Sequence, residues 1–241
     1  MGGLTGVVAW FSDASHWRGN EGVPARLVEH VGLTAAALGI ACAIALPLAL
    51  WLGHLGRGGT LAINISNVGR AVPTFAVLVL LTLAPAPFGL SVTSIVTALV
   101  LFGVPPIVTN TYVGMREVDR GVVEAARGMG MSGWQLLRRV ELPLATPLLL
   151  NGVRLAAVQI VATATIAALV AGGGLGRIVT SGFARQDQPE LLAGALLVAL
   201  LALAVELLFA VAQRLAAPDS RARRATSNGA PAPDAEVAAT L

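Results

Sequence analysis

Lysine is absent from this chain of 241 residues, and all 16 of its basic residues are arginines. Because a P-loop needs a lysine against the nucleotide phosphates, the absence excludes a Walker A ATPase site in this chain. Cysteine occurs once, as Cys42 in an apolar run, which excludes an internal disulfide. The three histidines, His16, His30 and His54, are far apart and have no carboxylate at ligand spacing, so no metal site is expected.

Charged residues are also scarce, at 12%, whereas hydrophobic residues reach 56% and the mean hydropathy is +0.78. This composition is incompatible with an ordinary soluble fold. Uncharged apolar stretches of about 18 residues or more indicate membrane helices. The sequence therefore predicts an all-α, polytopic membrane protein with about five transmembrane helices.

The apolar stretches divide the chain into three parts. Residues 1–29 are expected to form an extracytoplasmic, interfacial segment, residues 30–213 the transmembrane domain, and residues 214–241 a disordered cytoplasmic tail rich in alanine, proline and serine. Proline and glycine clusters divide the apolar sequence into separate helices. The spans are expected at about 31–52, 71–84 (starting before Arg70, near Ile63 or Asn64), 91–111, 146–170 and 191–211. A break or a re-entrant turn is expected at Gly172–Gly174 and Gly176.

One long charged segment, residues 116–143, interrupts the apolar sequence. Asp119 is a suitable N-cap for a short helix, and Gly130 is suited to end it in the left-handed conformation. Ser132 and Gln135 have the spacing of a capping box at the start of a second helix, which Pro143 is expected to stop. A nucleic-acid partner is not expected, because this helix–turn–helix is tied to membrane spans at both ends and carries four carboxylates, Glu117, Asp119, Glu124 and Glu141.

The same segment contains a spaced signature. Glu124-Ala125-Ala126, three residues, Gly130, nine residues, Val140, one residue and Leu142-Pro143 resemble the cytoplasmic loop of permease subunits of ATP-binding-cassette (ABC) importers. The resemblance implies the permease fold of type I importers, with this loop as a coupling helix in a groove of the ATPase subunit. It also implies a second permease subunit (the same chain or a sister chain), two ATPase subunits that bind ATP and Mg²⁺, an extracytoplasmic solute-binding protein, and no catalysis or cofactor in this chain.

Further stretches narrow the resemblance. Val104–Ile107, Asn110–Tyr112, Glu124–Met131 and Gly173–Gly176 are similar to osmoprotectant importers, which take up glycine betaine, choline, carnitine or proline-like solutes. The Gly-Gly-Leu-Gly element is shared with methionine-type importers, so an importer of methionine or another amino acid stays open. A secondary carrier or channel that uses no ATP is the alternative from another class.

Polar residues within the spans are candidates for the solute path, because they are costly in lipid unless they meet a partner or water. Helix–helix hydrogen bonding is the competing explanation for each threonine. The candidates on the two spans that flank the charged segment are Thr109, Asn110, Tyr112, Gln159, Thr163 and Thr165. Arg154 and Glu206 fall at similar depth in the fourth and fifth spans, so an intramembrane ion pair is one expectation. The alternative is that Arg154 snorkels to the interface and Glu206 faces polar backbone groups.

Arginines predict the orientation of the chain in the plasma or inner membrane. With the charged segment in the cytoplasm, five spans put the N-terminus outside and the C-terminus inside. Outside segments then hold only Arg18, Arg26, Arg177 and Arg185, in agreement with the positive-inside rule. Inside segments hold eleven: Arg57, Arg70, Arg116, Arg120, Arg127, Arg138, Arg139, Arg214, Arg221, Arg223 and Arg224.

Overall fold

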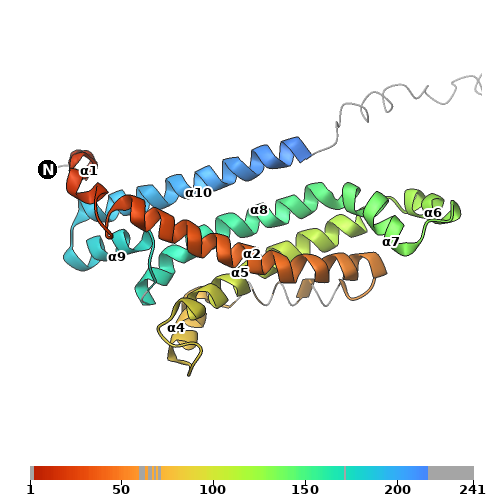
Figure 1. The fold of residues 1–241 in the computed structure, drawn as a ribbon, viewed down its shortest axis with the longest axis horizontal. Helices are drawn as coiled ribbons and strands as arrows, with labels where there is room; N and C mark the ends of the chain where they lie inside the picture. Colours follow the sequence, from red (N-terminus) through yellow and green to blue (C-terminus); the bar gives the residue numbers. More distant parts are fainter. Residues whose placement is uncertain are drawn as a thin grey trace, which may run out of the picture.

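The computed structural model describes residues 3–59, 63–64, 67, 69, 72–170 and 172–216. Its main body is an elongated helix bundle (Figure 1). Four of the described helices or continuous helical stretches are long and apolar enough to cross a membrane. They centre on α2 (Val23–Leu55), α5 (Val92–Arg116), α8 (Leu142–Ala167) and α10 (Gln188–Ala216). The all-α membrane architecture that the composition predicts is confirmed.

The second predicted span is only partly described. α4 (Thr74–Leu83) is an apolar helix of 10 residues, too short to cross a bilayer by itself. Ile63 and Asn64, near which this span is expected to begin, are helical. Several residues between them and Thr74 lie outside the described part of the chain, so the longer span stays a prediction.

Small residues allow the central helices to approach closely. Ala37, Ala41, Ala45 and Ala49 recur every fourth residue along α2, so they share one face, and each is fully buried. A Cβ atom on Gly103 of α5 would lie 2.8 Å from Ile160 Cδ1 of α8 and 3.2 Å from the Cβ atom of Ala41. Close packing through alanine and glycine is typical of helices in membranes.

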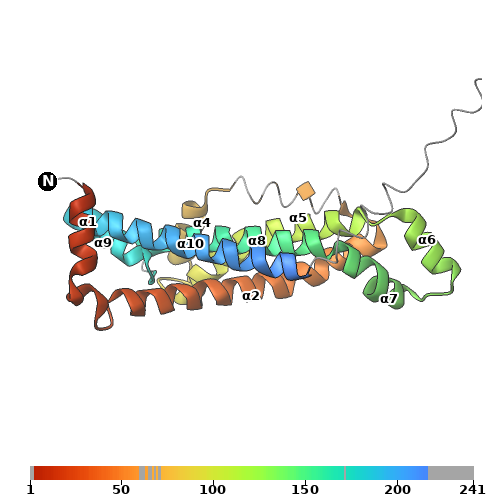
Figure 2. The same cartoon turned by 90° about the horizontal axis from the view of Figure 1, so that it is seen from above.

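Shorter elements cover the two ends of the bundle. α1 (Gly3–Ser12), the 3₁₀ turn η1 (Ala14–Trp17) and α9 (Gly176–Arg185) lie at one end, with α1 across the bundle axis (Figure 2). The predicted glycine-rich break precedes α9 and is confirmed: α8 ends at Ala167, the turn η3 (Ala168–Val170) follows, and Gly174 has a φ of +76°. The charged segment lies at the opposite end. It contains α6 (Arg120–Gly128), α7 (Gly133–Leu136) and η2 (Leu137–Glu141), and we call residues 120–141 the coupling segment.

Candidate functional site

The first helix of the coupling segment, α6, begins and ends as the sequence predicts. Asp119 Oδ1 accepts a hydrogen bond from the Gly121 backbone N–H at 2.7 Å, which makes Asp119 the N-cap. Gly130 has a φ of +83°. The Gly130 N–H donates to the Arg127 carbonyl at 2.9 Å, and the Met131 N–H donates to the Ala126 carbonyl at 3.2 Å. These two bonds form a Schellman motif, in which glycine takes the left-handed position without strain.

The second helix begins as predicted but does not end at Pro143. The capping box is present: Gln135 Oε1 accepts from the Ser132 N–H at 2.9 Å, and the Ser132 hydroxyl accepts from the Gln135 N–H at 3.4 Å. The predicted stop is wrong, because helical structure runs from Gly133 to Val170 through η2, a single π-helical turn. Pro143 follows this π turn, and a π turn is one of the ways in which a helix accommodates a residue that interrupts its hydrogen-bond ladder.

A small apolar core folds the coupling segment onto itself. Val123 and Ala126 of α6 pack with Val118 and Leu136, and all four are buried. The opposite side of α6 presents Glu124 and Ala125 to the surface. The signature residues therefore have two different environments. Ala126 packs in the core of the segment, whereas Glu124 and Ala125 are exposed and can contact another molecule.

Apolar side chains are exposed beside these charged residues. Met129 is 73% exposed and Trp134 is 65% exposed. The Arg138 guanidinium lies over the Trp134 ring, 5.7 Å from its centroid. A hollow of about 410 Å³ is lined by Trp134, Gln135, Arg138 and Arg139. An exposed tryptophan in an arginine-lined hollow is suited to docking another protein.

The last two signature residues lie next to an unpredicted contact. Leu142 is half-buried and Pro143 is exposed, and both follow Glu141, which is 4% exposed. His54 Nδ1, in the last turn of α2, lies 2.5 Å from the Glu141 carboxylate. No local signal in the sequence could reveal this contact, because the two residues are 87 positions apart.

The candidate path residues lie on two helices that pack against each other, but they do not form a single cluster. Asn110 Oδ1 accepts from Asn151 Nδ2 at 3.1 Å, which places Asn110 beside the first half of α8. The Gly103–Ile160 contact places the second half of α8 beside the middle of α5. The candidates therefore spread along the α5–α8 pair: Thr109, Asn110 and Tyr112 on α5, and Gln159, Thr163 and Thr165 on α8.

Two of these candidates have unsatisfied hydroxyl groups. Thr109 Oγ1 and Thr165 Oγ1 are buried and have no hydrogen-bond partner among the described residues. A buried hydroxyl without a partner costs free energy, so an additional donor or acceptor at these positions would stabilise the helix pair.

The structure places the two intramembrane charges in contact. The Arg154 guanidinium of α8 donates to the Glu206 carboxylate of α10. The same guanidinium donates to Gln213 Oε1 at 3.1 Å, and Gln213 Nε2 donates to the Pro147 carbonyl at 3.0 Å. Both partners of the ion pair are partly exposed along the side of the bundle.

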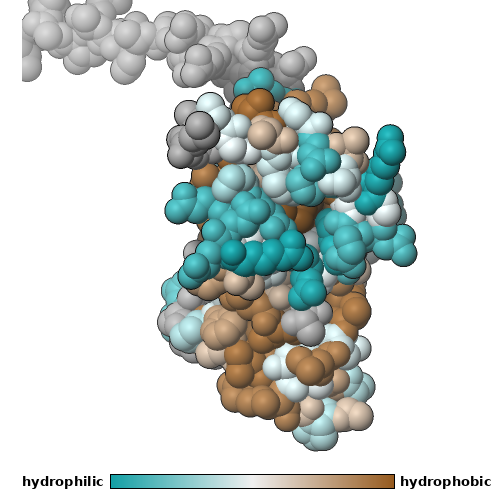
Figure 3. Space-filling view, turned by 90° about the vertical axis from the view of Figure 1, so that its left-hand side faces the viewer, coloured by the Kyte–Doolittle hydropathy of each residue, from teal (hydrophilic) through white to brown (hydrophobic). Residues whose placement is uncertain are grey.

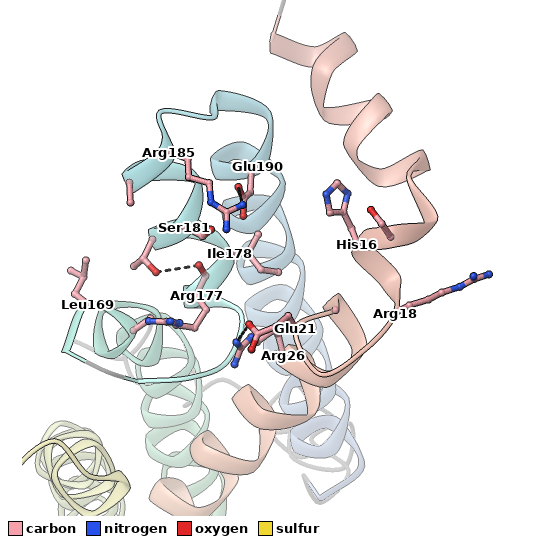
Figure 4. Close-up of a pocket in the computed structure, with 15 residues that line it drawn as sticks. His16, Arg18, Glu21, Arg26, Leu169, Arg177, Ile178, Ser181, Arg185 and Glu190 are labelled. Carbon is pink, nitrogen blue, oxygen red and sulfur yellow. Dashed lines mark hydrogen bonds and ion pairs between the residues drawn. The ribbon is translucent and has the colours of Figure 1, made fainter.

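The end of the bundle that carries α1 and α9 gathers hydrophilic side chains (Figure 3). A pocket of about 610 Å³ lies there, between the N-terminal segment and α9 (Figure 4). Arg26 pairs with both Glu21 and Glu29 beside it. The charged side chains that line the pocket are Arg18, Glu21, Arg26, Arg177, Arg185 and Glu190.

The start of α2 also holds the glycine-rich loop before α9. Glu29 Oε2 accepts a hydrogen bond from the Gly174 N–H at 2.8 Å, and His30 Nε2 lies 3.1 Å from the Val161 carbonyl of α8. Added Cβ atoms would lie 1.6 Å from Glu29 Oε1 at Gly173 and 2.8 Å from His30 Nδ1 at Gly174. Glu29 and Gly174 are 145 positions apart, so this contact too had no local signal.

Comparison with known proteins gives a family. Residues 39–222 match the family described as "Binding-protein-dependent transport system inner membrane component". The glycine betaine/carnitine/choline transport system permease protein OpuCB of Bacillus subtilis is 30% identical over 190 residues, which cover 79% of this chain and 86% of that protein. The osmoprotectant import permease protein OsmY of Salmonella typhimurium is 36% identical over 184 residues, covering 76% and 77%.

Solved structures have the same fold. The inward-facing MetNI methionine ABC transporter matches with a TM-score of 0.70 at 21% identity, covering 81% of this chain and 96% of that chain. An amino acid ABC transporter solved with histidines matches with a TM-score of 0.63 at 22% identity, covering 89% and 98%.

Proposed function

Because this chain belongs to the family of binding-protein-dependent transport system inner membrane components, we propose that it is the permease of an ABC importer for osmoprotectants. The solutes are quaternary amines such as glycine betaine, choline and carnitine, or proline. The assignment to osmoprotectants rests on the similarity to OpuCB over 86% of that protein's length. The methionine transporter shares the fold at only 21% identity, so it gives methionine less support.

The coupling segment is the site at which two ATPase subunits, with ATP and Mg²⁺, act on the permease. Its exposed side carries Glu124, Ala125 and Trp134, next to arginines that can meet carboxylates of the partner. Gly130 sets the angle between α6 and α7 through its positive φ. Leu142 and Pro143 are the first two residues of α8 and directly follow the segment, so a displacement of the segment is delivered to that helix directly.

The solute path runs between two permease subunits, the same chain twice or a sister chain, because one bundle of this size encloses little volume. Thr109 and Thr165 lie on α5 and α8, the two helices that flank the coupling segment, and this placement of polar residues supports the assignment. Asn110, Tyr112, Gln159 and Thr163 complete the candidate lining. The Arg154–Glu206 pair ties α10 to α8.

The orientation follows from charge. The end that carries the coupling segment lies in the cytoplasm, where arginine-rich loops accumulate. The N-terminal segment and α9 lie outside, where an extracytoplasmic binding protein delivers the solute. ATP binding closes the two ATPase subunits, their motion displaces the coupling segments, and the path opens alternately to the two sides. The C-terminus lies in the cytoplasm.

The test is uptake into proteoliposomes that contain the permease, its ATPase and its binding protein. Labelled glycine betaine should enter with ATP, and labelled methionine should enter much more slowly. Faster uptake of methionine would overturn the solute class. Uptake driven by an ion gradient in the absence of ATP would instead identify a secondary carrier.

A further inference from the structure

The inner end of α2 is tied to the coupling segment by an acid and a histidine. The Glu141 side chain is 6% exposed, and the His54 side chain, 2.5 Å away, is 21% exposed. His54 lies at the C-terminal end of α2, and Glu141 lies at the N-terminal end of α8. Gly133 packs here too, since an added Cβ would lie 3.5 Å from His54 Nε2.

The outer end of α2 is tied to the glycine-rich loop. Gly174 is buried, and its N–H donates to the Glu29 carboxylate at 2.8 Å. His30 is fully buried between this loop and the Val161 carbonyl. Side chains at Gly173 or Gly174 would overlap Glu29 or His30, so the loop sits directly on the start of α2.

These two contacts lie at opposite ends of one helix. His30 and His54 are separated by 24 residues, which corresponds to about 36 Å along α2. Between them the helix is continuous, passes through Pro47, and buries an alanine face against α5 and α8. Closely packed interiors have low compressibility and transmit strain, so a displacement at one end of α2 is passed on toward the other.

We propose that α2 transmits the motion of the coupling segment to the outer glycine-rich loop through two polar clamps, His54–Glu141 inside and Glu29–Gly174 outside. His54, Glu141 and Glu29 are positioning residues. The proposal rests on the proposed function, because it assigns α2 a part in ATP-driven transport. α5 and α8 are joined covalently to the coupling segment and also pack along α2, so the inner clamp adds a direct contact between the segment and α2.

If motion passes first through the inner clamp and then through the outer clamp, the effect of breaking both clamps in one variant can be predicted. Glu141→Ala removes the buried carboxylate without leaving a buried charge, and Glu29→Ala releases the Gly174 N–H. Each should lower the solute imported per ATP hydrolysed by roughly tenfold, the factor that one hydrogen bond to a charged group supports. The double variant should be no worse than the poorer single variant, because either break already interrupts the link.

An additive result in the double variant would overturn the proposal. Residues this far apart with independent local roles have additive effects, so a loss of roughly a hundredfold in the double variant overturns the proposal. Unchanged import per ATP in the single variants also overturns it. Glu21→Ala is the matched control at the outer end, because Glu21 pairs with Arg26 as Glu29 does and is not the partner of Gly174. If an alanine variant does not accumulate, the same cycle with Glu141→Gln and Glu29→Gln replaces it, with smaller losses expected.

Hydrogen exchange separates this proposal from the proposed function, because it needs no solute. In the purified permease–ATPase complex, Glu141→Ala should speed amide exchange at residues 172–178, which include the glycine-rich loop that contacts the start of α2. Glu29→Ala should likewise speed exchange at residues 137–142. Exchange that changes only beside each substitution would reject the link, whereas failure of the wild type to import glycine betaine would reject the solute class alone.

Discussion

The Arg154 guanidinium of α8 contacts the Glu206 carboxylate of α10, along the side of the bundle that the membrane encloses. Replacing either partner alone leaves an unpaired charge among the spans, which is costly in lipid. We expect Arg154→Gln and Glu206→Gln each to lower the amount of folded protein and its melting temperature in detergent. Fluorescence-detected size exclusion after heating measures both quantities.

The double variant Arg154→Gln/Glu206→Gln is the control for this pair. It contains no unpaired charge, so its melting temperature should recover most of the loss. Two single variants that are as stable as the wild type would show that the contact contributes nothing to assembly.

Gly130 is the turn residue of the coupling segment. Gly130→Asp puts a charged side chain at a φ of +83°, in the left-handed region that glycine occupies more readily than any residue with a Cβ atom. We expect the protein to insert normally and uptake of glycine betaine to be abolished, because the angle between α6 and α7 changes. Gly128→Ala is the matched control, since Gly128 is helical and has open space around it, so uptake should persist. Normal uptake by Gly130→Asp would count against the coupling role.

Gly174 combines a positive φ with a close neighbour. In Gly174→Ala the new Cβ would lie 2.8 Å from His30 Nδ1 at a φ of +76°, so the loop must move away from α2. The melting temperature should fall, and the cost includes at least the strain of about 1–2 kcal/mol. Gly32→Ala, on α2 with nothing within 4 Å, should be neutral or slightly stabilising. Equal melting temperatures for the two variants would contradict the packing argument.

Trp134 tests the docking surface. Trp134→Ala removes a side chain that is 65% exposed, so the amount of folded permease should not change. Its affinity for the ATPase should fall by about 2 kcal/mol, roughly 30-fold, as for a central tryptophan of an interface. Co-purification at graded ATPase concentrations measures the change. Trp17→Ala, at the opposite end, should retain the ATPase, and equal retention by both variants would place the interface elsewhere.

Local chemistry made much of the coupling segment predictable. Asp119, Gly130, Ser132 and Gln135 act through hydrogen bonds to residues within a few positions, so their spacing was sufficient. The helix stop expected at Pro143 is wrong because the sequence alone does not show whether a proline ends a helix or follows a π turn within one. The π turn η2 just before Pro143 lets the helix continue, and whether such a turn forms depends on tertiary packing.

Contacts between distant residues could not be predicted. His54–Glu141 and Glu29–Gly174 exist only because α2 and α8 lie side by side, and residues 87 and 145 positions apart leave no pattern in one sequence. The Arg154–Glu206 contact is different. Two charges in otherwise apolar antiparallel spans, at similar depth, have few alternative partners, so their depth alone pointed to the pair.

The central claim is that a separate ATPase drives solute through this chain by way of the coupling segment. The most direct test is uptake of labelled glycine betaine by proteoliposomes that contain the whole complex, with ATP or with a non-hydrolysable analogue. We expect accumulation with ATP and none with the analogue. In Gly130→Asp, accumulation should be lost while the ATPase still hydrolyses ATP. Accumulation with the analogue, or without any ATPase subunit, would contradict the central claim.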